Sequence, residues 1–343
     1  MDYSFDNIED SLDNLSFPDR LKSVWSLFKH TFTIIGHDED ILVPWYRLLI
    51  YNTVMVIAFF YGWLGWWLDL PLEGWMIFLA IVLFIYKYFY YNKQEMRMSW
   101  IVYEVVVGND PDYPSSVAAC KSIQSQIRKI AWLDIGMTFI QKGKWAGGGF
   151  LMILVRLFLS GVEEVWDLIN HYLLPSVAVD KLDITSGVKK MKKLKSQIPE
   201  SLVGVFGIDF LGSVTRQIVV PVYLVLGVLA IGLGVGLAGY VPSSEIQGSE
   251  NAKYWFETLQ FTWIPVVVAL MIGKLFSSII AQTVTAVKVI YFTIFYTKIT
   301  HPNRIKPELQ ADLVDYLKLK GVDEVDDLDK QDTDPAPNPN PAG

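Results

Sequence analysis

One predicted helix in the middle of the chain concentrates side chains that could bind a metal ion. Glu164, Asp167 and His171 are spaced i, i+3 and i+7, so they share a helical face, and Glu163 adds a carboxylate beside them. Carboxylates and an imidazole are suitable ligands for a divalent cation. A metal centre between helices needs matching ligands from a second helix, and the sequence offers no second set. We therefore predict no metal, no cofactor and no catalytic residue; this face would instead be the polar side of an interfacial helix.

A cluster of lysines follows this helix. Five of the seven residues from 189 to 195 are lysines, namely Lys189, Lys190, Lys192, Lys193 and Lys195. A basic cluster beside a membrane attracts anionic lipid head groups, by about 1 kcal/mol for each charge near the surface. Nucleic acid is not an expected partner, because the cluster lies between membrane segments and lacks interleaved aromatic residues. The lysines therefore indicate contact with anionic lipid, or they serve only to orient the chain in the membrane.

Two charged side chains interrupt apolar segments. Lys274 lies near the middle of the last long apolar segment, and Arg156 interrupts a shorter one. A charge within the hydrocarbon layer is costly and marks a candidate functional site. Asp209, or the pair of Glu163 and Glu164, is the candidate partner of Lys274. The alternative is a shifted or tilted helix from which the lysine reaches the membrane surface.

Two glycine patterns lie in one apolar segment. Residues 234–239 match the GxGxxG spacing of dinucleotide-binding proteins, but they follow no strand and open no βαβ unit, so we exclude nucleotide binding. Gly232 and Gly236 form a GxxxG pair, which permits two membrane helices to approach closely. We therefore assign these two glycines to helix packing. The sequence contains no Ser-His-Asp, phosphate-loop, HExxH or CxxC pattern.

The composition is that of a membrane protein. Of the 343 residues, 52% are hydrophobic and 14% are aromatic, with 12 tryptophans. A helix of about 20 apolar residues is long enough to span a bilayer. Four segments reach or approach this length: 46–68, 75–91, 218–240 and 261–286. The sequence therefore predicts an all-α integral membrane protein with about four transmembrane helices in two hairpins, and amphipathic or re-entrant helices in a cytoplasmic middle region.

Seven regions are expected along the chain. In order, they are a disordered acidic N-terminus (1–19), an interfacial amphipathic helix (20–45), the first transmembrane hairpin (46–91), a cytoplasmic and membrane-associated helical region (92–217), the second hairpin (218–296), an amphipathic segment (297–320) and a disordered acidic tail (321–343). Within the middle region, 145–180 and 201–217 contain apolar runs too short to cross the membrane, which leaves re-entrant and interfacial placements open.

Lysine and arginine are distributed unevenly over the loops. The loop at 69–74 has none and the loop at 241–260 has one, whereas 92–217 has 15 and the segment from 288 onward has seven. Positively charged loops stay on the cytoplasmic side of a membrane. The sequence therefore predicts a multi-pass protein of the cytoplasmic membrane, with both termini and the middle region in the cytoplasm.

Five segments carry a resemblance to a known family. SVWSLFK at 23–29 and DEDILVP at 38–44 resemble the opening of a domain-of-unknown-function family of bacterial and archaeal multi-pass membrane proteins. That family begins with a short amphipathic helix, an acidic turn and a proline before its first span. VW at 165–166 and LLPSVAVD at 173–180 are similar to its tryptophan, its proline ending an apolar run and its acidic residue. The basic helix that follows in the family corresponds to 187–195.

The resemblance covers about residues 20 to 300 and has departures. Asp180 stands where glutamate is usual, and Gly187, Lys190 and Met191 replace a common Ala…Arg-Ser pattern. The family has no established activity. The resemblance therefore implies the multi-pass helical architecture and assigns no catalytic residue.

Three functions are compatible with the sequence. The first is a non-enzymatic scaffold or component of a membrane complex, whose partners are the lipid bilayer, anionic lipid head groups and another membrane protein or a second copy. The second is a channel or transporter with Lys274 in its path. The third is a lipid-directed membrane enzyme that uses the face from Glu163 to His171.

Overall fold

The computed structural model describes residues 38–142, 173–194, 208–247, 258–307 and 309. The chain forms two compact units, 1–305 and 306–343, and every element named below belongs to the first. In order, these elements are η1 (Glu39–Ile41), α3 (Leu42–Leu68), α4 (Glu73–Val106), α5 (Tyr113–Lys121), α6 (Gln124–Lys142), α9 (Ile184–Leu194), α11 (Ile208–Gly236), β1 (Ser244–Gln247), β2 (Thr258–Phe261), α12 (Ile264–Thr300) and η3 (Pro302–Arg304). Residues 173–180 are also helical.

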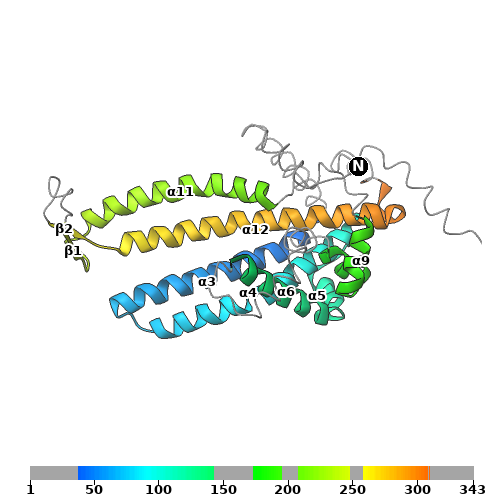
Figure 1. The fold of residues 1–343 in the computed structure, drawn as a ribbon, viewed down its shortest axis with the longest axis horizontal. Helices are drawn as coiled ribbons and strands as arrows, with labels where there is room; N and C mark the ends of the chain where they lie inside the picture. The colour runs from blue at the N-terminus through cyan, green and yellow to red at the C-terminus, as the bar shows by residue number, and fades with distance from the viewer. Residues whose placement is uncertain (1–37, 143–172, 195–207, 248–257, 308, 310–343) are drawn as a thin grey trace, which may run out of the picture. The chain divides into compact units, whose positions relative to one another are not determined.

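Four helices, α3, α4, α11 and α12, are long and apolar enough to cross a membrane. They form two antiparallel hairpins, α3 with α4 and α11 with α12 (Figure 1). This confirms the predicted all-α fold with four candidate spans in two hairpins. Both hairpin turns lie at one end of the first unit, which we call the loop end (Figure 1). The opposite end carries α5, α6, α9 and η3, and we call it the core end.

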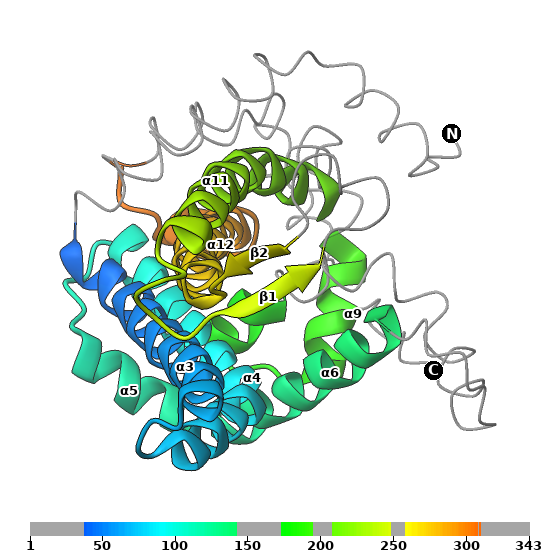
Figure 2. The ribbon, with the colours of Figure 1, turned by 90° about the vertical axis from the view of Figure 1, so that its left-hand side faces the viewer.

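Helix α12 lies at the centre of the four (Figure 2). It contacts α11 on one side and both α3 and α4 on the other. At the loop end, Val56 and Phe60 of α3 pack against Val267 of α12 and bury one another. The two hairpins are therefore joined mainly through α12.

Glycine makes the turn of the first hairpin tight. A Cβ atom at Gly62 would come within 2.6 Å of Ile77 Cγ1 and 2.9 Å of its backbone nitrogen, so only glycine lets α3 approach α4 this closely. Asp69 ends α3 in the left-handed conformation with φ 51°, and its N–H donates to Gly65 O. Leu72 is also left-handed, with φ 69°, and precedes α4. The connection therefore needs only four residues, 69–72.

The second hairpin carries a small β-hairpin that the sequence did not predict. β1 and β2 pair antiparallel, with Ser244 opposite Phe261. The buried Phe261 ring lies over Gly234, where a Cβ would meet the ring at 2.4 Å, and Thr262 N–H donates to Gly234 O at 3.0 Å. Gly273 of α12 similarly faces the Tyr223 ring. Gly234 and Gly273, rather than Gly232 and Gly236, make the close approaches within the described part of this hairpin.

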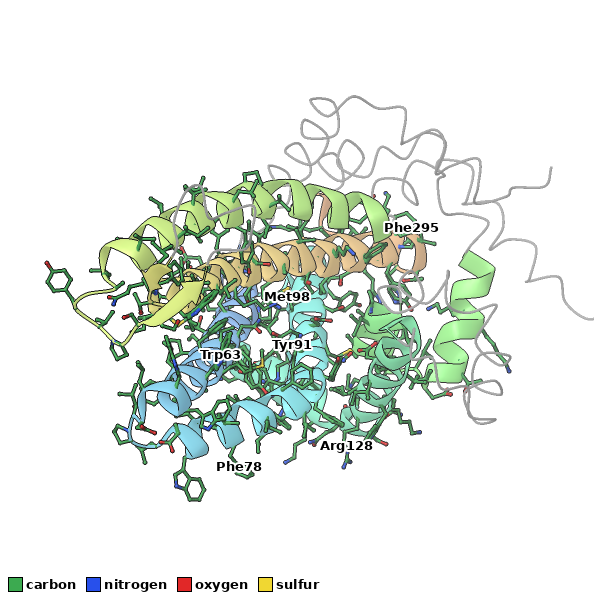
Figure 3. The ribbon with its side chains drawn as sticks, turned by 60° about the vertical axis from the view of Figure 1, so that its left-hand side comes forward. Trp63, Phe78, Tyr91, Met98, Arg128 and Phe295 are labelled. Carbon is green, nitrogen blue, oxygen red and sulfur yellow. The ribbon has the colours of Figure 1, made fainter. Side chains whose placement is uncertain are left out.

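The core end buries apolar side chains from several helices. α4 has 34 residues and α12 has 37, so they are about 51 and 55 Å long, against about 30 Å of hydrocarbon in a bilayer. The excess length of α4 packs against that of α12 and against α5 and α6. Met98 of α4 and Phe295 of α12 are almost fully buried there, whereas Phe78 at the loop end is 58% exposed (Figure 3).

The observed helix boundaries differ from the predicted spans at several ends, most of all where helices extend into the core end. α4 continues to Val106, beyond the expected end at residue 91. α11 begins at Ile208 and ends at Gly236, so the ambiguous segment 208–217 is part of the same continuous helix as the third span. The proposed re-entrant segment at 145–172, the interfacial helix before residue 38 and both acidic termini lie outside the described residues.

Candidate functional site

A carboxylate with three partners lies at the core end. Asp180 Oδ2 accepts a hydrogen bond from Lys190 Nζ at 2.5 Å and another from the Tyr296 hydroxyl, and Oδ1 lies 2.8 Å from His301 Nε2. We call these four residues the Asp180 cluster. They come from the helical segment 173–180, from α9, from the last turns of α12 and from the residue that follows α12. The cluster therefore ties three parts of the chain together at one carboxyl group.

Local structure explains why Lys190 reaches Asp180. Lys181 is left-handed, with φ 54°, and reverses the chain directly after the helical segment. Asp183 then accepts from the N–H groups of Thr185 and Ser186 at 3.2 and 3.4 Å and caps α9. A Cβ at Gly187 would come within 2.6 Å of a Leu173 side-chain carbon, so glycine lets α9 pack closely on the preceding segment. This packing brings the side of α9 that carries Lys190 over the carboxyl group.

The surroundings of Asp180 stabilise its ionised form. Burial alone would raise its pKa, but the hydrogen bonds from Lys190, Tyr296 and His301, together with the charge of Lys190, outweigh burial and lower the pKa. Lys190 Nζ also lies 5.1 Å from the centroid of the Tyr296 ring, in a cation–π arrangement. Only 16% of the Asp180 side chain is exposed. The carboxylate is thus ionised and engaged on both oxygens, which leaves it poorly suited to act as a general base.

A cavity lies beside the cluster. The His301 ring packs edge-on against Tyr103 of α4 at 6.0 Å, and the Tyr103 hydroxyl accepts a hydrogen bond from Arg304 Nη1 at 3.1 Å. The cavity has a volume of about 620 Å³. It is lined by Trp100, Tyr103, Glu104, Val107, Asn109, Ala119, Val179, Lys181 and Arg304. We call it the Arg304 cavity.

Two cations, Lys181 and Arg304, and two aromatic residues, Trp100 and Tyr103, give this cavity its chemistry. Lys181 is exposed and has no hydrogen-bond or ion-pair partner among the described residues. Arg304 is exposed and uses one donor on Tyr103, and that hydrogen bond raises the pKa of its guanidinium. Glu104 is the one acidic side chain on the wall, and it accepts from Asn109 Nδ2 at 2.5 Å. An anion that needs several donors, such as a phosphate group, suits this arrangement.

Other polar groups at this end hold helices together. Asn92 of α4 donates to Asp134 of α6 at 2.5 Å, and Ser99 of α4 shares a 2.8 Å hydrogen bond with Thr293 of α12. Burial raises the pKa of Cys120 to about 11, although nearby cations partly oppose this, so the thiol stays protonated. The described residues contain no group of three or more His, Cys, Asp or Glu side chains that could hold a metal ion. These contacts are structural ties rather than catalytic groups.

The residues singled out from the sequence lie in different places. Lys190 is in the Asp180 cluster, and Lys189 is exposed on α9. The structure does not describe the side chains of Lys192 and Lys193. It also does not describe Arg156, the face from Glu163 to His171, or Lys195. Lys274 is exposed on α12 and has no partner among the described residues. A Cβ at Gly232 or Gly236 would meet nothing within 4 Å, so their packing role stays a prediction for contact with another molecule.

Five polar residues of the site were missed by sequence reasoning. They are Tyr103, Lys181, Tyr296, His301 and Arg304, and they were not selected because single polar residues near helix ends carry no recognisable spacing. The polar run from His301 to Arg304 directly after a long apolar helix was the available signal. Asp180 entered only through the family resemblance.

Comparison with known proteins adds no identification. No family model, no curated protein and no solved structure matches this chain. In the residues it describes, the structure establishes an all-α fold with four candidate membrane spans, a small β-hairpin at one end of them and a polar site at the other.

Proposed function

We propose that this chain is a non-enzymatic multi-pass membrane protein, a scaffold or component of a membrane complex, that binds anionic head groups at the Arg304 cavity. The observation that supports head-group binding is the pair of exposed cations, Lys181 and Arg304, on one cavity wall beside Trp100. Asp180 forms no hydrogen bond with these cations, because Lys190, Tyr296 and His301 occupy its oxygens, although its charge acts on Arg304. Lys189 of α9 is also exposed and would add positive charge at the core end.

The head-group proposal also requires that the core end lies at the cytoplasmic membrane surface. The positive-inside distribution supports this placement, since most of the described lysines and arginines lie at the core end, whereas the sequence of the two loops at the loop end has one lysine. Replacing the single cysteine by Cys120→Ser permits labelling of Lys189→Cys and of Ser243→Cys, which are both exposed at opposite ends. In sealed right-side-out vesicles, an impermeant maleimide should label residue 243 and not residue 189. The reverse pattern would place the Arg304 cavity outside.

Binding can be measured with soluble short-chain lipids. Dioctanoyl-phosphatidylglycerol and dioctanoyl-phosphatidylcholine would each be titrated calorimetrically into the full chain in neutral detergent. The combined variant Lys181→Gln and Arg304→Gln should bind the anionic lipid about 30-fold more weakly, because each charge near the surface contributes about 1 kcal/mol. The matched control, Lys121→Gln with Arg128→Gln, removes two exposed cations elsewhere at the core end and should change little. Equal losses in both variants would contradict a specific site.

Inorganic phosphate distinguishes a head group from a free anion. Binding of phosphate as tight as that of the anionic lipid would assign the cavity to a soluble anion. Preference for the lipid by tenfold or more would support the membrane function.

The two other functions named from the sequence have less support. Lys274 is exposed on α12 and lines neither the Arg304 cavity nor the apolar groove between α11 and α12. These two cavities therefore do not place Lys274 in a transport path. The face from Glu163 to His171 lies outside the described residues. A channel or transporter remains the alternative function, and ion flux through proteoliposomes that is abolished by Lys274→Ala would establish it in place of the scaffold.

A further inference from the structure

We propose that Lys274 and the groove beside it bind a transmembrane helix of a different protein, and that this partner helix carries an Asp or Glu near the middle of its span. The inference rests on the proposed role as a component of a membrane complex and names the chemistry of the partner. Two independent features support it: an exposed cation without a partner among the described residues, and an apolar groove on the same side of α12.

Lys274 lies too deep in the bilayer to reach water easily. α12 begins at Ile264 beside the exposed Trp263, so Lys274 is ten residues, or about 15 Å, from the loop end of the helix. Half of the hydrocarbon thickness is also about 15 Å. A lysine side chain is about 6 Å long, so it ends well short of both surfaces. A cation at this depth is strongly stabilised by a neighbouring carboxylate.

The chain does not supply this carboxylate from the helices that the structure describes. Asp209 was the candidate from the sequence. Tyr223 of α11 lies against Gly273, which places Lys274 level with Tyr223. Asp209 is 14 residues before Tyr223 on the continuous helix α11, which is about 21 Å away along the axis. Glu163 and Glu164, the other candidates, lie outside the described residues.

The four described spans of a second copy do not supply it either. The sequence has no Asp or Glu in 42–68, 74–91, 218–236 or 264–300, which are the apolar parts of the four spans. Any of these spans would bring another cation or an uncharged side chain to this position. Charge complementarity therefore favours a different protein.

An apolar groove lies one helical turn from Lys274. It has a volume of about 300 Å³ and opens between α11 and α12. Small residues of both helices, Gly227, Ala230 and Ala269, line it together with aromatic rings at the loop end. Leu270 lines the groove and precedes Lys274 by four residues, so both lie on one face of α12. Small residues at a helix surface let another helix approach closely, so a partner helix seated in the groove would pass Lys274.

Designed single-span helices test the pairing. The protein, labelled at Ser243→Cys in a Cys120→Ser background, would be reconstituted in pure phosphatidylcholine vesicles with acceptor-labelled Leu/Ala helices of about 20 residues. The helices would carry a central Asp, Leu or Lys. Energy transfer should show at least about tenfold stronger association of the Asp helix than of the Leu helix. Lys274→Leu should remove this difference, and Lys274→Asp should transfer the preference to the Lys helix.

A second variant separates the groove from simple charge attraction. A Cβ at Gly227 meets nothing within 4 Å, so Gly227→Leu fits the chain while filling the groove. This variant keeps Lys274 and should weaken association of the Asp helix several-fold. Unchanged binding in Gly227→Leu would overturn the role of the groove.

Two further outcomes would overturn the proposal. One is equal association of the Asp and Leu helices with the native protein. The other is Lys274-dependent energy transfer between two labelled copies without any added helix, which would identify the occupant as a second copy. Binding of dioctanoyl-phosphatidylglycerol is measured on the same variants. If the lipid still binds while the protein does not prefer the Asp helix to the Leu helix, only this inference fails. If lipid binding is lost in the Lys181 and Arg304 variant alone, head-group binding stands independently of the partner helix.

Discussion

The two halves of α12 lie in different surroundings although they belong to one continuous helix. Towards the loop end, Leu270, Ile272 and Ile279 are exposed apolar side chains, and Lys274 is exposed among them. Towards the core end, all seven residues from Tyr291 to Thr297 are buried. One half has the surface expected for lipid, and the other has the interior of a folded domain.

The two halves of α12 are stabilised by different kinds of side chain. In the lipid-facing half, shape comes from small residues and helix length, and polar groups are few. In the buried half, polar side chains are numerous and nearly all of those described have a partner, as in the Asp180 cluster and in the pair of Ser99 and Thr293. A helix about 55 Å long exceeds the bilayer, so its second half is free to build a site.

Removing one phenyl ring from the core end and one from the loop end gives the largest expected contrast. Phe295 is 1% exposed and Phe78 is 58% exposed (Figure 3). Phe295→Ala should lower the free energy of unfolding by about 3–5 kcal/mol because it leaves an enclosed cavity. Phe78→Ala should cost under about 1 kcal/mol, because most of its side chain is exposed and its ring packs only edge-on against Trp75. Thermal unfolding in one detergent measures both, and similar losses would show that the core end is not a packed domain.

Removing the charge of Asp180 should have a smaller effect with a distinct pH dependence. Asp180→Asn leaves Lys190 and His301 without their anion and should cost about 2 kcal/mol at neutral pH. Folding lowers the pKa of Asp180, so its ionised form stabilises the fold at pH values above the ordinary pKa of an aspartate. This contribution is lost as the pH falls below about 4. The melting temperatures of native and variant protein should therefore converge in acid.

A matched variant controls for a general loss of negative charge. Asp110 is exposed in the loop before α5, and Asp110→Asn should melt like the native protein. A difference between native protein and Asp180→Asn that persists unchanged to pH 3 would show that the carboxylate is not ionised in the fold.

The sequence predicted the spans because their signal is local. A run of apolar residues as long as 46–68 has one physical solution in a membrane, a helix with satisfied backbone groups. The end of α4 could not be found in this way, because Asn92 and Arg97 resemble the start of a loop. Both are buried in the structure by helices that follow later in the chain. Polar residues therefore hid the part of α4 that belongs to the core end.

The Asp180 cluster was beyond sequence reasoning for a related reason. Asp180 and His301 are 121 residues apart, and no periodicity relates them. Lys190 was assigned to lipid because it lies among other lysines, and only the turn at Lys181 shows that it points to Asp180. Lys274 was recognised as an intramembrane charge, since its position depends on the helix alone. That its side chain is exposed depends on packing, which the sequence does not encode locally.

Glycine substitutions give the smallest contrast and test how the lipid-facing halves are built. Gly62→Ala places a methyl group against the backbone of Ile77 and should cost about 1–3 kcal/mol. Gly232→Ala meets no atom within 4 Å and should be neutral or stabilise the helix by up to about 1 kcal/mol. Thermal unfolding of the purified chain measures both, with Gly236→Ala as a second open position. Equal destabilisation at positions 62 and 232 would mean that α11 is covered by protein even in the isolated chain. If Gly232→Ala weakens binding of a partner helix without destabilising the isolated chain, the GxxxG face of α11 would be the surface that contacts the partner.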